Sequence, residues 1–452
     1  MKTAFNDMKN KIIFLILVAL LQISTGYTQS FDKAKIDSFF DRLAEKHKAM
    51  GSLTIAKDGQ VLYTRAIGYS QINETGKKAI TAATRFRIAS ITKMYTAVMI
   101  FQLVEEGKLK LTDTLYQFFP QVANARKITI AHILGHRSGI HDALLDKNLR
   151  PAAGWNAITK DEMFAIIAKG TPDFEPDAQH AYSNSGYAIL GLIIEKLTGK
   201  PYEEALRERI TARIGLRDTY IATGDIDVNK NEALSYMDLG GNWKQVSEPP
   251  SSLLFGAGAI ISTPTEMAQF IQALFTGKLI SPASLNQMKT MREGEGLGME
   301  PFTFAGKTFY GHTGGSSSNG AWLAYLPEEK LAVAYTTNAK IYPVRNIMSG
   351  VIDIYYNRSF EVPAFASIAV SLEVLDKYVG VYSTTAAPVK LTITREGTTL
   401  FFQPPGEKAV ALEATADNTF TIGGAVVIEF DAAKKQMTIK RGGGIRIFTK
   451  DN

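Results

Sequence analysis

A serine and a lysine three residues apart are the first feature of this sequence that could do chemistry. Ser90 and Lys93 lie in the stretch FRIASITKM, among apolar and small residues. Residues three apart on a helix share a face, and a lysine beside apolar neighbours has a lowered pKa, so it can take a proton from a serine. The spacing alone is weak, because a chain of this length should contain it about twice by chance, and Ser30 and Lys33 repeat it. The alternative is an ordinary solvated helix lysine.

A second candidate group lies in the stretch HAYSNSGY, where Tyr182 and Asn184 are two residues apart. A tyrosine beside the serine and lysine would pass protons between them and the leaving group, and an asparagine would hydrogen-bond the substrate. The simpler interpretation is a loop that ends in a helix N-cap, where Ser and Asn are preferred. The same spacing also occurs at Tyr355–Asn357.

A third candidate group opens the stretch GHTGGSSSNGAWLAYLP, in which His312, Thr313, Gly314 and Gly315 lead into a strand-like run. Glycines in a strand let a substrate lie close to the backbone. A backbone N–H of this strand could form an oxyanion hole together with the N–H of Ser90. A lone histidine in such a place is more often structural.

In this order, the three groups resemble the motifs of the serine β-lactamase and penicillin-binding protein superfamily. The resemblance is closest to the class C β-lactamase and DD-peptidase branch, and it runs from about Phe31 to Asn357. Further stretches that agree are ITIAHILGHRSGI, GAGAIISTPTEMAQF and GLGM. The resemblance implies acyl transfer to water through an acyl-enzyme.

The resemblance also implies a role for each motif residue. Ser90 would be the acylated nucleophile, with Lys93 as its base and Tyr182 as a proton relay. Asn184 would orient the acyl side chain. The other substrate-binding positions would be His312 and Thr313 at the carboxylate or leaving-group end, Gly314 within the third motif, and Gly315, whose N–H would complete the oxyanion hole with that of Ser90.

The third motif departs from that of efficient β-lactamases, which usually carry lysine where this chain has His312. An imidazole with its ordinary pKa of about 6.5 is mostly neutral at pH 7, so it attracts a substrate carboxylate less. Glu300, just after Gly296–Gly298, would repel a carboxylate and favour an amine. We therefore expect a DD-carboxypeptidase, D-aminopeptidase or esterase with weak or no β-lactamase activity. Its substrate would be a D-amino-acid peptide, a peptidoglycan-derived peptide or a small ester.

The surrounding sequence predicts the elements that must position these residues. Strand-like runs joined by Asp58–Gly59 open the region, and two more, AWLAYLP and LAVAYTTN, close it. Apolar residues at helical spacing predict helices at Lys33–Met50, Ser90–Leu103, Ile128–Leu134, Ser185–Lys200 and Pro264–Lys278. The fold class we expect is α/β (α+β): one antiparallel sheet built from both ends of the region, flanked by helices, with a helical insertion.

The pattern changes after residue 358. Residues 359–371 show no period and suggest a linker after a hydrolase domain at 29–358. Residues 372–452 alternate in short runs separated by Gly, Pro, Asp and Asn, which predicts a small all-β barrel domain. Its role stays open between oligomer contact, capping of the active site and ligand binding.

The first 28 residues predict a secretory signal peptide. Lysines precede the apolar run IIFLILVALLQI, and the small and polar stretch STGYTQS follows. The run is shorter than the roughly 20 residues that span a bilayer. We expect cleavage near Gly26 or Thr28, a periplasmic or secreted protein, and no stable membrane span afterwards.

The composition and the absence of certain motifs argue against other functional classes. The net charge of +6 is thinly spread, which argues against nucleic-acid binding, and the absence of cysteine excludes disulfides and thiol nucleophiles. No G-x-S-x-G or H-E-x-x-H motif occurs, and we interpret His132 and His136 as structural. We expect no metal and no cofactor. The only partner we expect is a small peptide or ester substrate, which includes peptidoglycan fragments. The oligomeric state stays open. The alternative function is a non-catalytic penicillin-recognising sensor or peptidoglycan-binding module.

Overall fold

The computed structural model describes most of the chain beyond residue 30. The described residues are 31–74, 76–146, 158–222, 224–238, 243–316, 318–363, 365, 368–385, 387–406, 409–422, 426–441 and 444–451. The predicted signal peptide, and Ser30 of the second Ser-x-x-Lys pattern, lie outside them. Among these residues, none of the helices is long and apolar enough to cross a membrane.

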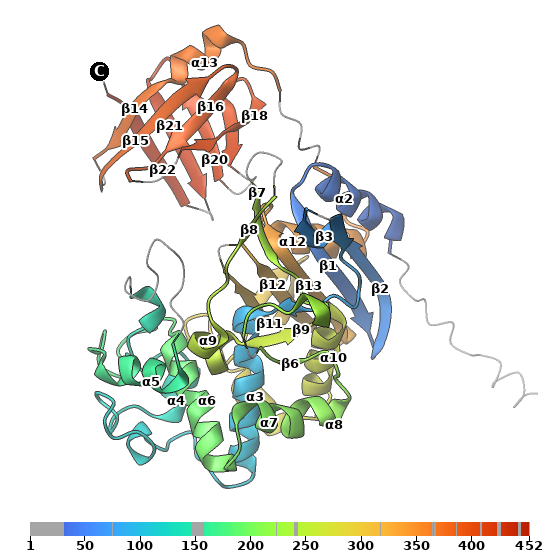
Figure 1. Ribbon diagram of the computed structural model, residues 1–452, viewed down its shortest axis with the longest axis vertical. Coiled ribbons are helices and arrows are strands. Elements are labelled where there is room, and N and C mark those ends of the chain that lie inside the picture. Colours follow the sequence, from blue (N-terminus) through green and yellow to red (C-terminus); the bar gives the residue numbers. More distant parts are fainter. Residues whose placement is uncertain are drawn as a thin grey trace, which may run out of the picture.

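One six-stranded antiparallel sheet is assembled from both ends of the first region, as the sequence predicts (Figure 1). Asp58 and Gly59 join its first hairpin, and both have positive φ, 50° and 84°. The central strands are buried along almost their whole length because helices cover both faces. In spatial order the strands are β10 (Glu300–Phe304), β11 (Lys307–Gly315), β12 (Gly320–Leu326), β13 (Leu331–Lys340), β1 (Ala49–Lys57) and β2 (Gln60–Ile67).

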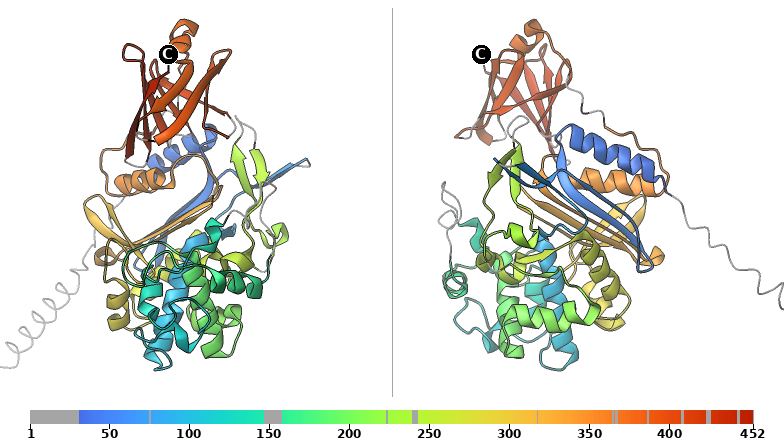
Figure 2. Two further views of the ribbon diagram at one scale, coloured as in Figure 1. Left: turned by 90° about the vertical axis from the view of Figure 1, so that its left-hand side faces the viewer. Right: turned by 45° about the vertical axis from the view of Figure 1, so that its right-hand side comes forward.

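Helices pack on the two faces of this sheet (Figure 2). On one face, α2 (Lys33–Glu45) and α12 (Val344–Tyr355) share an apolar core with the central strands. A larger core on the other face joins the sheet to the helical body. The principal helices of that body are α3 (Thr92–Glu105), α6 (Asn184–Thr198), α9 (Ser251–Gly258) and α10 (Pro264–Phe275).

Several predicted helix boundaries differ from the structure by a few residues, and local backbone geometry explains two of them. The first helix ends at Glu45 and not at Met50, because His47 takes a left-handed φ of 53° and turns the chain into β1. The helix expected from Ser90 begins at Thr92, after a 3-10 turn, η1 (Ala89–Ile91). Both corrections are short, but the second one places Ser90 in the turn that precedes the helix.

The remaining elements of the first region are short and connect these layers. The helices are α4 (Ile130–Leu134), α5 (Lys160–Lys169), α7 (Tyr202–Leu206), α8 (Ala212–Ile214) and α11 (Pro282–Met288). The strands, which form three small sheets, are β3 (Tyr69–Asn73), β4 (Gly76–Ala79), β5 (Phe86–Arg87), β6 (Tyr220–Ile221), β7 (Ser235–Asp238), β8 (Trp243–Val246) and β9 (Ile260–Ser262).

The C-terminal region forms a nearly closed, barrel-like sheet of nine strands around its own apolar core, as expected. A helix, α13 (Leu372–Tyr378), precedes it and was not expected. Lys48 of the first region pairs with Glu413 of the barrel, with 2.6 Å between Nζ and Oε1. The strands are β14 (Gly380–Thr384), β15 (Ala387–Glu396), β16 (Thr399–Gln403), β17 (Val410–Ala411), β18 (Glu413–Ala416), β19 (Thr419–Ile422), β20 (Val426–Asp431), β21 (Gln436–Arg441) and β22 (Gly444–Lys450).

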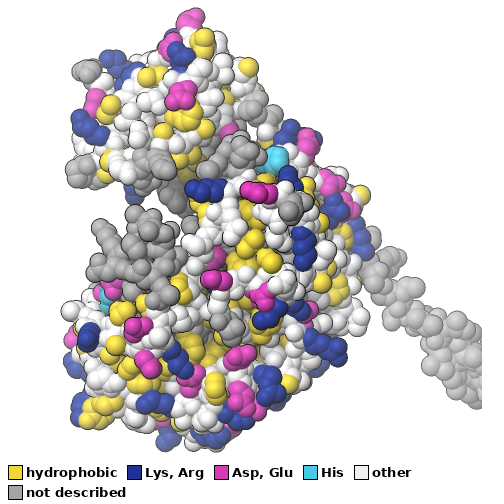
Figure 3. Space-filling view, in the orientation of Figure 1, with side chains coloured by type: hydrophobic (Ala, Val, Ile, Leu, Met, Phe, Trp, Pro, Cys, Tyr) yellow, Lys and Arg dark blue, Asp and Glu magenta, His cyan; other side chains and the backbone are white. Residues whose placement is uncertain are grey.

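The surface charge follows the thin spread of charged residues along the sequence. On the face in Figure 3, side chains of Lys and Arg alternate with those of Asp and Glu over both regions. The binding partners expected from the composition stay a prediction.

Candidate active site

Ser90 lies where the sheet meets the helical body. It is the middle residue of η1, which leads directly into α3. Ala89 before it has a φ of 46°, which residues with a Cβ rarely adopt, and Ser90 lines a pocket. Because Ser90 stands at the N-terminus of α3, its hydroxyl lies at the positive end of the helix dipole, where a developing alkoxide is stabilised.

Lys93 is completely buried in the first turn of α3, with 0% of its surface exposed. Its Nζ is 3.2 Å from Ser90 Oγ, 2.8 Å from Asn184 Oδ1 and 3.0 Å from the carbonyl oxygen of Ala257. These three acceptors hold the amine beside the serine, and none of them is a carboxylate. The structure therefore rules out the alternative of a solvated helix lysine.

The surroundings of Lys93 suit a general base. Burial lowers the pKa of Lys93 to about 7, because the charged ammonium loses its hydration. The carboxylates of Asp142, Glu295 and Glu300 oppose this by favouring the charged form. A lysine with a pKa of about 7 is partly deprotonated at neutral pH, so it can accept the proton of Ser90.

Tyr182 lies next to both Lys93 and Ser90. Its ring centroid is 4.6 Å from Lys93 Nζ, and its ring stacks on His136 with centroids 4.3 Å apart. Although 38% of the Tyr182 surface is exposed, the surrounding protein raises the pKa of its hydroxyl, while a hydrogen bond with Ser90 lowers it. The net shift is upward, so Tyr182 stays protonated at neutral pH and can relay a proton but not act as a phenolate base.

Asn184 is the first residue of α6, whose N-cap is Ser183. Its side chain accepts from Lys93 through Oδ1 and donates through Nδ2 to Asp142 Oδ2, at 2.8 Å in both cases. It also lines the pocket, where the sequence expects it to meet the substrate. Asn184 thus connects the lysine to a buried acid, Asp142, which the sequence did not single out.

The glycines of the third motif let β11 approach the serine. A Cβ on Gly314 would lie 2.2 Å from the carbonyl oxygen of Ile88 and 3.1 Å from the nitrogen of Ser90, so only glycine fits. Gly315 and Ser90 line the same pocket. The two segments whose N–H groups are expected to form the oxyanion hole therefore lie side by side, and the hole itself stays a prediction.

His312 is buried and neutral. Its Nδ1 donates to the carbonyl oxygen of Thr313. Burial, together with the charge of Lys93, lowers the pKa of His312 to about 3. Thr313 donates hydrogen bonds to Glu300, and burial raises the pKa of Glu300 to about 7. Glu300 is therefore a weaker source of repulsion at neutral pH than an ordinary glutamate would be.

The pocket around Ser90 also has walls that no motif predicts. Glu248 is among them, and its Oε1 accepts from Ser318 Oγ at 2.9 Å and from Ser316 Oγ at 3.3 Å. A pocket lined by a nucleophile whose base is buried beside it, and by a separate carboxylate, can cleave an acyl bond and also recognise a cationic group. The other lining residues outside the motifs include Arg87, Leu144, Leu254, Ala257 and Asn319.

Comparison with known proteins bears on the same region. The model of the family described as Beta-lactamase matches residues 36–351, which include every pocket residue named above. The chain belongs to this family. The resemblance that the three motifs suggest is thereby confirmed, and the protein is a hydrolase of the serine β-lactamase and penicillin-binding protein type.

Relatives of this β-lactamase family member include penicillin-binding proteins and an amidase. Penicillin-binding protein 4* of Bacillus subtilis (strain 168) is 24% identical over 451 residues, which cover 90% of this chain and 96% of that protein. D-amino acid amidase from Ochrobactrum anthropi SV3 is similar in structure, with a TM-score of 0.63 and 25% identity, over 71% of this chain and 99% of that chain. The octameric penicillin-binding protein homologue from Pyrococcus abyssi shares the fold over 92% of this chain and 100% of that chain, with a TM-score of 0.65 and 24% identity.

Sequence reasoning missed several residues that shape the site of this family member. The carbonyl of Ala257 accepts a hydrogen bond from Lys93, and Asp142 accepts one from Asn184, which itself accepts from Lys93. Both residues lie far from Lys93 along the chain and outside the three motifs. A strained residue turns the segment that carries this carbonyl, since Phe255 has a φ of 36° within α9. The glycines in the stretch FGAGA were the available signal for an unusual backbone there.

Proposed function

We propose that this protein is an exported serine hydrolase that cleaves an amide or ester through an acyl-enzyme on Ser90. The observation that carries the proposal is the 3.2 Å contact between Lys93 Nζ and Ser90 Oγ. The burial that lowers the pKa of Lys93 to about 7 makes this amine available as a base near neutral pH.

The proposed reaction has two halves. Lys93 takes the proton of Ser90 as Oγ attacks the carbonyl carbon, and the N–H groups of Ser90 and Gly315 stabilise the oxyanion. The ammonium of Lys93 then returns this proton to the leaving amine or alcohol through Tyr182, which is hydrogen-bonded to Ser90, so Lys93 ends neutral and Tyr182 ends protonated. In the second half, water attacks the acyl-enzyme with the same groups in reversed roles, and Ser90 regains its proton.

The substrate class we propose is a D-amino-acid amide or peptide, a peptidoglycan-derived peptide or a small ester. The similarity to penicillin-binding proteins and to a D-amino acid amidase supports an acyl donor of this kind. Glu248 supports a substrate with a free amino group, because it lines the pocket and a carboxylate can accept from an ammonium.

We further propose weak or no β-lactamase activity. A carboxylate-bearing antibiotic needs a cation at the third motif, and the burial of His312 keeps its imidazole neutral at pH 7. A neutral ester or an amino-acid amide makes no such demand. The site therefore favours these substrates over β-lactams.

A labelling experiment combined with a substrate panel tests the proposal. A fluorophosphonate or fluorescent penicillin should label the mature protein at Ser90, and Ser90→Ala should abolish both labelling and turnover while its circular dichroism is unchanged. The panel is a D-Ala-D-Ala peptide, D-amino-acid amides, p-nitrophenyl esters and nitrocefin. If the protein turns over none of these substrates but forms a long-lived acyl adduct, the alternative function of a penicillin-recognising sensor is favoured. Unchanged turnover in Ser90→Ala would reject the mechanism.

Export is a separate part of the proposal and rests on the order of lysines, apolar run and small residues before residue 29. Expression in a Gram-negative host followed by fractionation and mass spectrometry tests it. We expect the periplasmic protein to begin near Thr28. A cytoplasmic protein that keeps residues 1–28 would contradict the proposed localisation and leave the chemistry untouched.

A further inference from the structure

One arginine, Arg137, joins two loops that lie beside the catalytic residues. It follows α4, in the stretch HILGHRSGI. The first loop, residues 171–183, precedes α6 and carries Tyr182 near its end. The second loop, residues 289–299, connects α11 to β10. No step of the proposed mechanism uses Arg137, and its contacts indicate what it does for the site.

The guanidinium of Arg137 holds both loops at once. Its Nε donates to Asp177 Oδ1 at 2.6 Å and its Nη2 donates to the carbonyl oxygen of Asp177 at 2.7 Å, in the first loop. Its Nη1 donates to Glu293 Oε2 in the second loop, at 2.7 Å. Arg292 of the second loop also pairs with Asp177, and only 7% of the Arg137 side chain is exposed. Because a guanidinium is planar and its donors point in fixed directions, these bonds fix the two loops relative to each other.

His136 carries this constraint to the tyrosine. Its ring stacks on that of Tyr182, with centroids 4.3 Å apart, and its Nδ1 accepts the N–H of Ser183 at 3.1 Å. Its carbonyl oxygen accepts the N–H of Ala181 at 2.9 Å. The backbone on both sides of Tyr182 is therefore bonded to His136, the neighbour of Arg137 in the chain.

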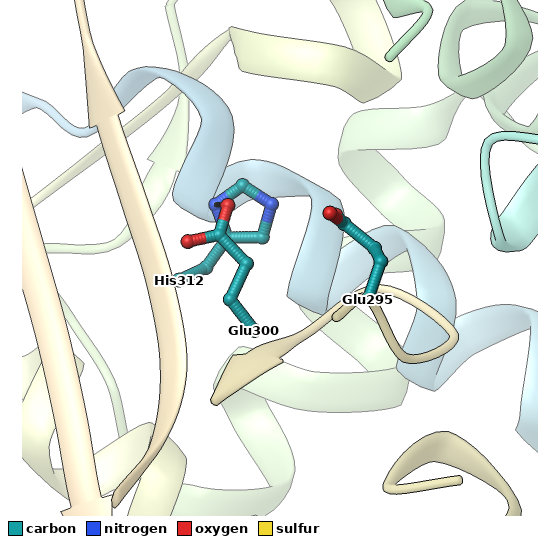
Figure 4. A group of neighbouring side chains, drawn as sticks. All are labelled: Glu295, Glu300 and His312. Carbon is teal, nitrogen blue, oxygen red and sulfur yellow. Dashed lines mark ion pairs between the residues drawn. The ribbon is translucent and has the colours of Figure 1, made fainter. Parts of the chain in front are cut away.

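The second loop also reaches His136. Oε1 of Glu295 lies 3.8 Å from Nε2 of this histidine, and that nitrogen carries a proton because Nδ1 is the acceptor. The carboxylate of Glu295 is one of the charges that act on Lys93, and in Figure 4 it points toward the ring of His312. Since both loops contact His136, the position of the ring on which Tyr182 stacks depends on how the loops are fixed.

We propose that Arg137 is a positioning residue for proton transfer to the leaving group. It fixes the two loops against each other and thereby keeps Tyr182 beside Ser90. The inference rests on the proposed mechanism, in which the proton reaches the leaving group through Tyr182. Since 38% of the Tyr182 surface is exposed, its hydrogen bond with Ser90 depends on the loop that carries it. Without Arg137, the reaction should slow most where the leaving group needs a proton.

Two esters of one D-amino acid separate this role from a general loss of structure. The ethanol of an ethyl ester leaves only when it is protonated, whereas p-nitrophenolate is stable enough to leave without a proton. The measurement is the ratio of kcat/KM for the ethyl ester to that for the p-nitrophenyl ester, because the acyl group is the same in both. We expect Arg137→Ala to lower this ratio at least about tenfold with an unchanged circular dichroism spectrum, since general acid catalysis contributes about 100-fold or more and misplacement of Tyr182 removes part of it.

Further variants complete the test. Tyr182→Phe should also lower the ratio, and Arg137→Ala/Tyr182→Phe should lower it no further than Tyr182→Phe does, because both changes interrupt the same proton path. Arg209→Ala is the matched control, because Arg209 makes two hydrogen bonds to Glu106, of 2.7 and 3.2 Å, and neither residue lies in the two loops. Its ratio should equal that of the wild type. If Arg137→Ala does not fold, Arg137→Lys replaces it, since lysine keeps the charge but loses the planar set of donors, and the ratio should fall at least about threefold.

The outcomes distinguish this role from the proposed function. Hydrolysis of neither ester by the wild type would reject the proposed function itself. Hydrolysis of both esters with an unchanged ratio in the Arg137 variant, reductions that multiply in the double variant, or an equal reduction in Arg209→Ala would each overturn the role of Arg137. A wild type that hydrolyses only the p-nitrophenyl ester would overturn it too, because no proton would then reach the leaving group.

Discussion

The acid buried behind the lysine should set the pH at which the enzyme works. Asp142 accepts from Asn184, which in turn accepts from Lys93, and its charge raises the pKa of the lysine against the larger effect of burial. Asp142→Asn removes this charge but keeps an oxygen that can accept from Asn184. We therefore expect the pKa of Lys93 to fall below the value of about 7 that the intact site gives it.

The structure sets the size of the effect. The ammonium of Lys93 and the carboxylate of Asp142 are separated by the amide group of Asn184 and by one hydrogen bond of 2.8 Å on each side of it. The distance between the two charges is therefore roughly 7 Å, and their interaction energy is about 2.4 kcal/mol at an effective dielectric constant of about 20. At 1.36 kcal/mol per pKa unit this is at most about 1.7 units, and we expect about one unit after local relaxation. Because the base must be deprotonated, kcat/KM rises with pH through the pKa of Lys93, and the variant should make this rise about one pH unit lower.

The assay is the pH profile of kcat/KM for a neutral p-nitrophenyl ester between about pH 5 and 9. At pH 6, a base with a pKa of about 7 is about one-tenth deprotonated and one with a pKa of about 6 is half deprotonated, so the variant should gain about fivefold relative to its own plateau. Asp146→Asn is the control, because this exposed acid on the same loop pairs with His141 and is absent from the charges that act on Lys93.

The midpoint of the profile, and not the plateau, decides the outcome. A lower plateau alone would mean only that Asn184 has shifted. A midpoint that is unchanged or moves to higher pH in Asp142→Asn, or an equal downward move in Asp146→Asn, would refute the idea that Lys93 is the titrating base and that Asp142 tunes it.

Three further predictions concern the other parts of the site. Lys93→Arg should lower kcat/KM about as much as Lys93→Ala, by at least about 100-fold, because arginine cannot be deprotonated. Substantial activity in Lys93→Arg would mean that Lys93 supplies only a positive charge and is not the base. Gly314→Ala should lower kcat at least about 100-fold and also the melting temperature, since its Cβ would displace η1, whereas Gly224→Ala, where nothing lies within 4 Å of the new Cβ, should do neither. His312→Lys should raise the ratio of kcat/KM for nitrocefin to that for a neutral ester at least about fivefold, because it adds the missing cation, and an unmoved ratio would contradict this account of specificity.

The sequence determined those features that depend on local patterns. The Asp58–Gly59 turn, the apolar stripes of the helices and the alternating C-terminal runs predict elements that the structure contains, since turn residues and periodicity act over a few positions. The order of the three motifs was enough to indicate the family. It also brought Ser90, Lys93, Tyr182 and Asn184 into one hypothesis before their distances were known.

Only the tertiary structure decided which groups surround these four residues. The carbonyl of Ala257 approaches Lys93 from α9, and the carboxylates of Asp142, Glu248 and Glu295 come from segments outside the three motifs. The pKa of Lys93 depends on how many charges and how little water surround it, and these are properties of packing between distant segments. Residue spacing encodes which groups share a helix or a strand; only the folded chain fixes the desolvation and the charge that one group imposes on another.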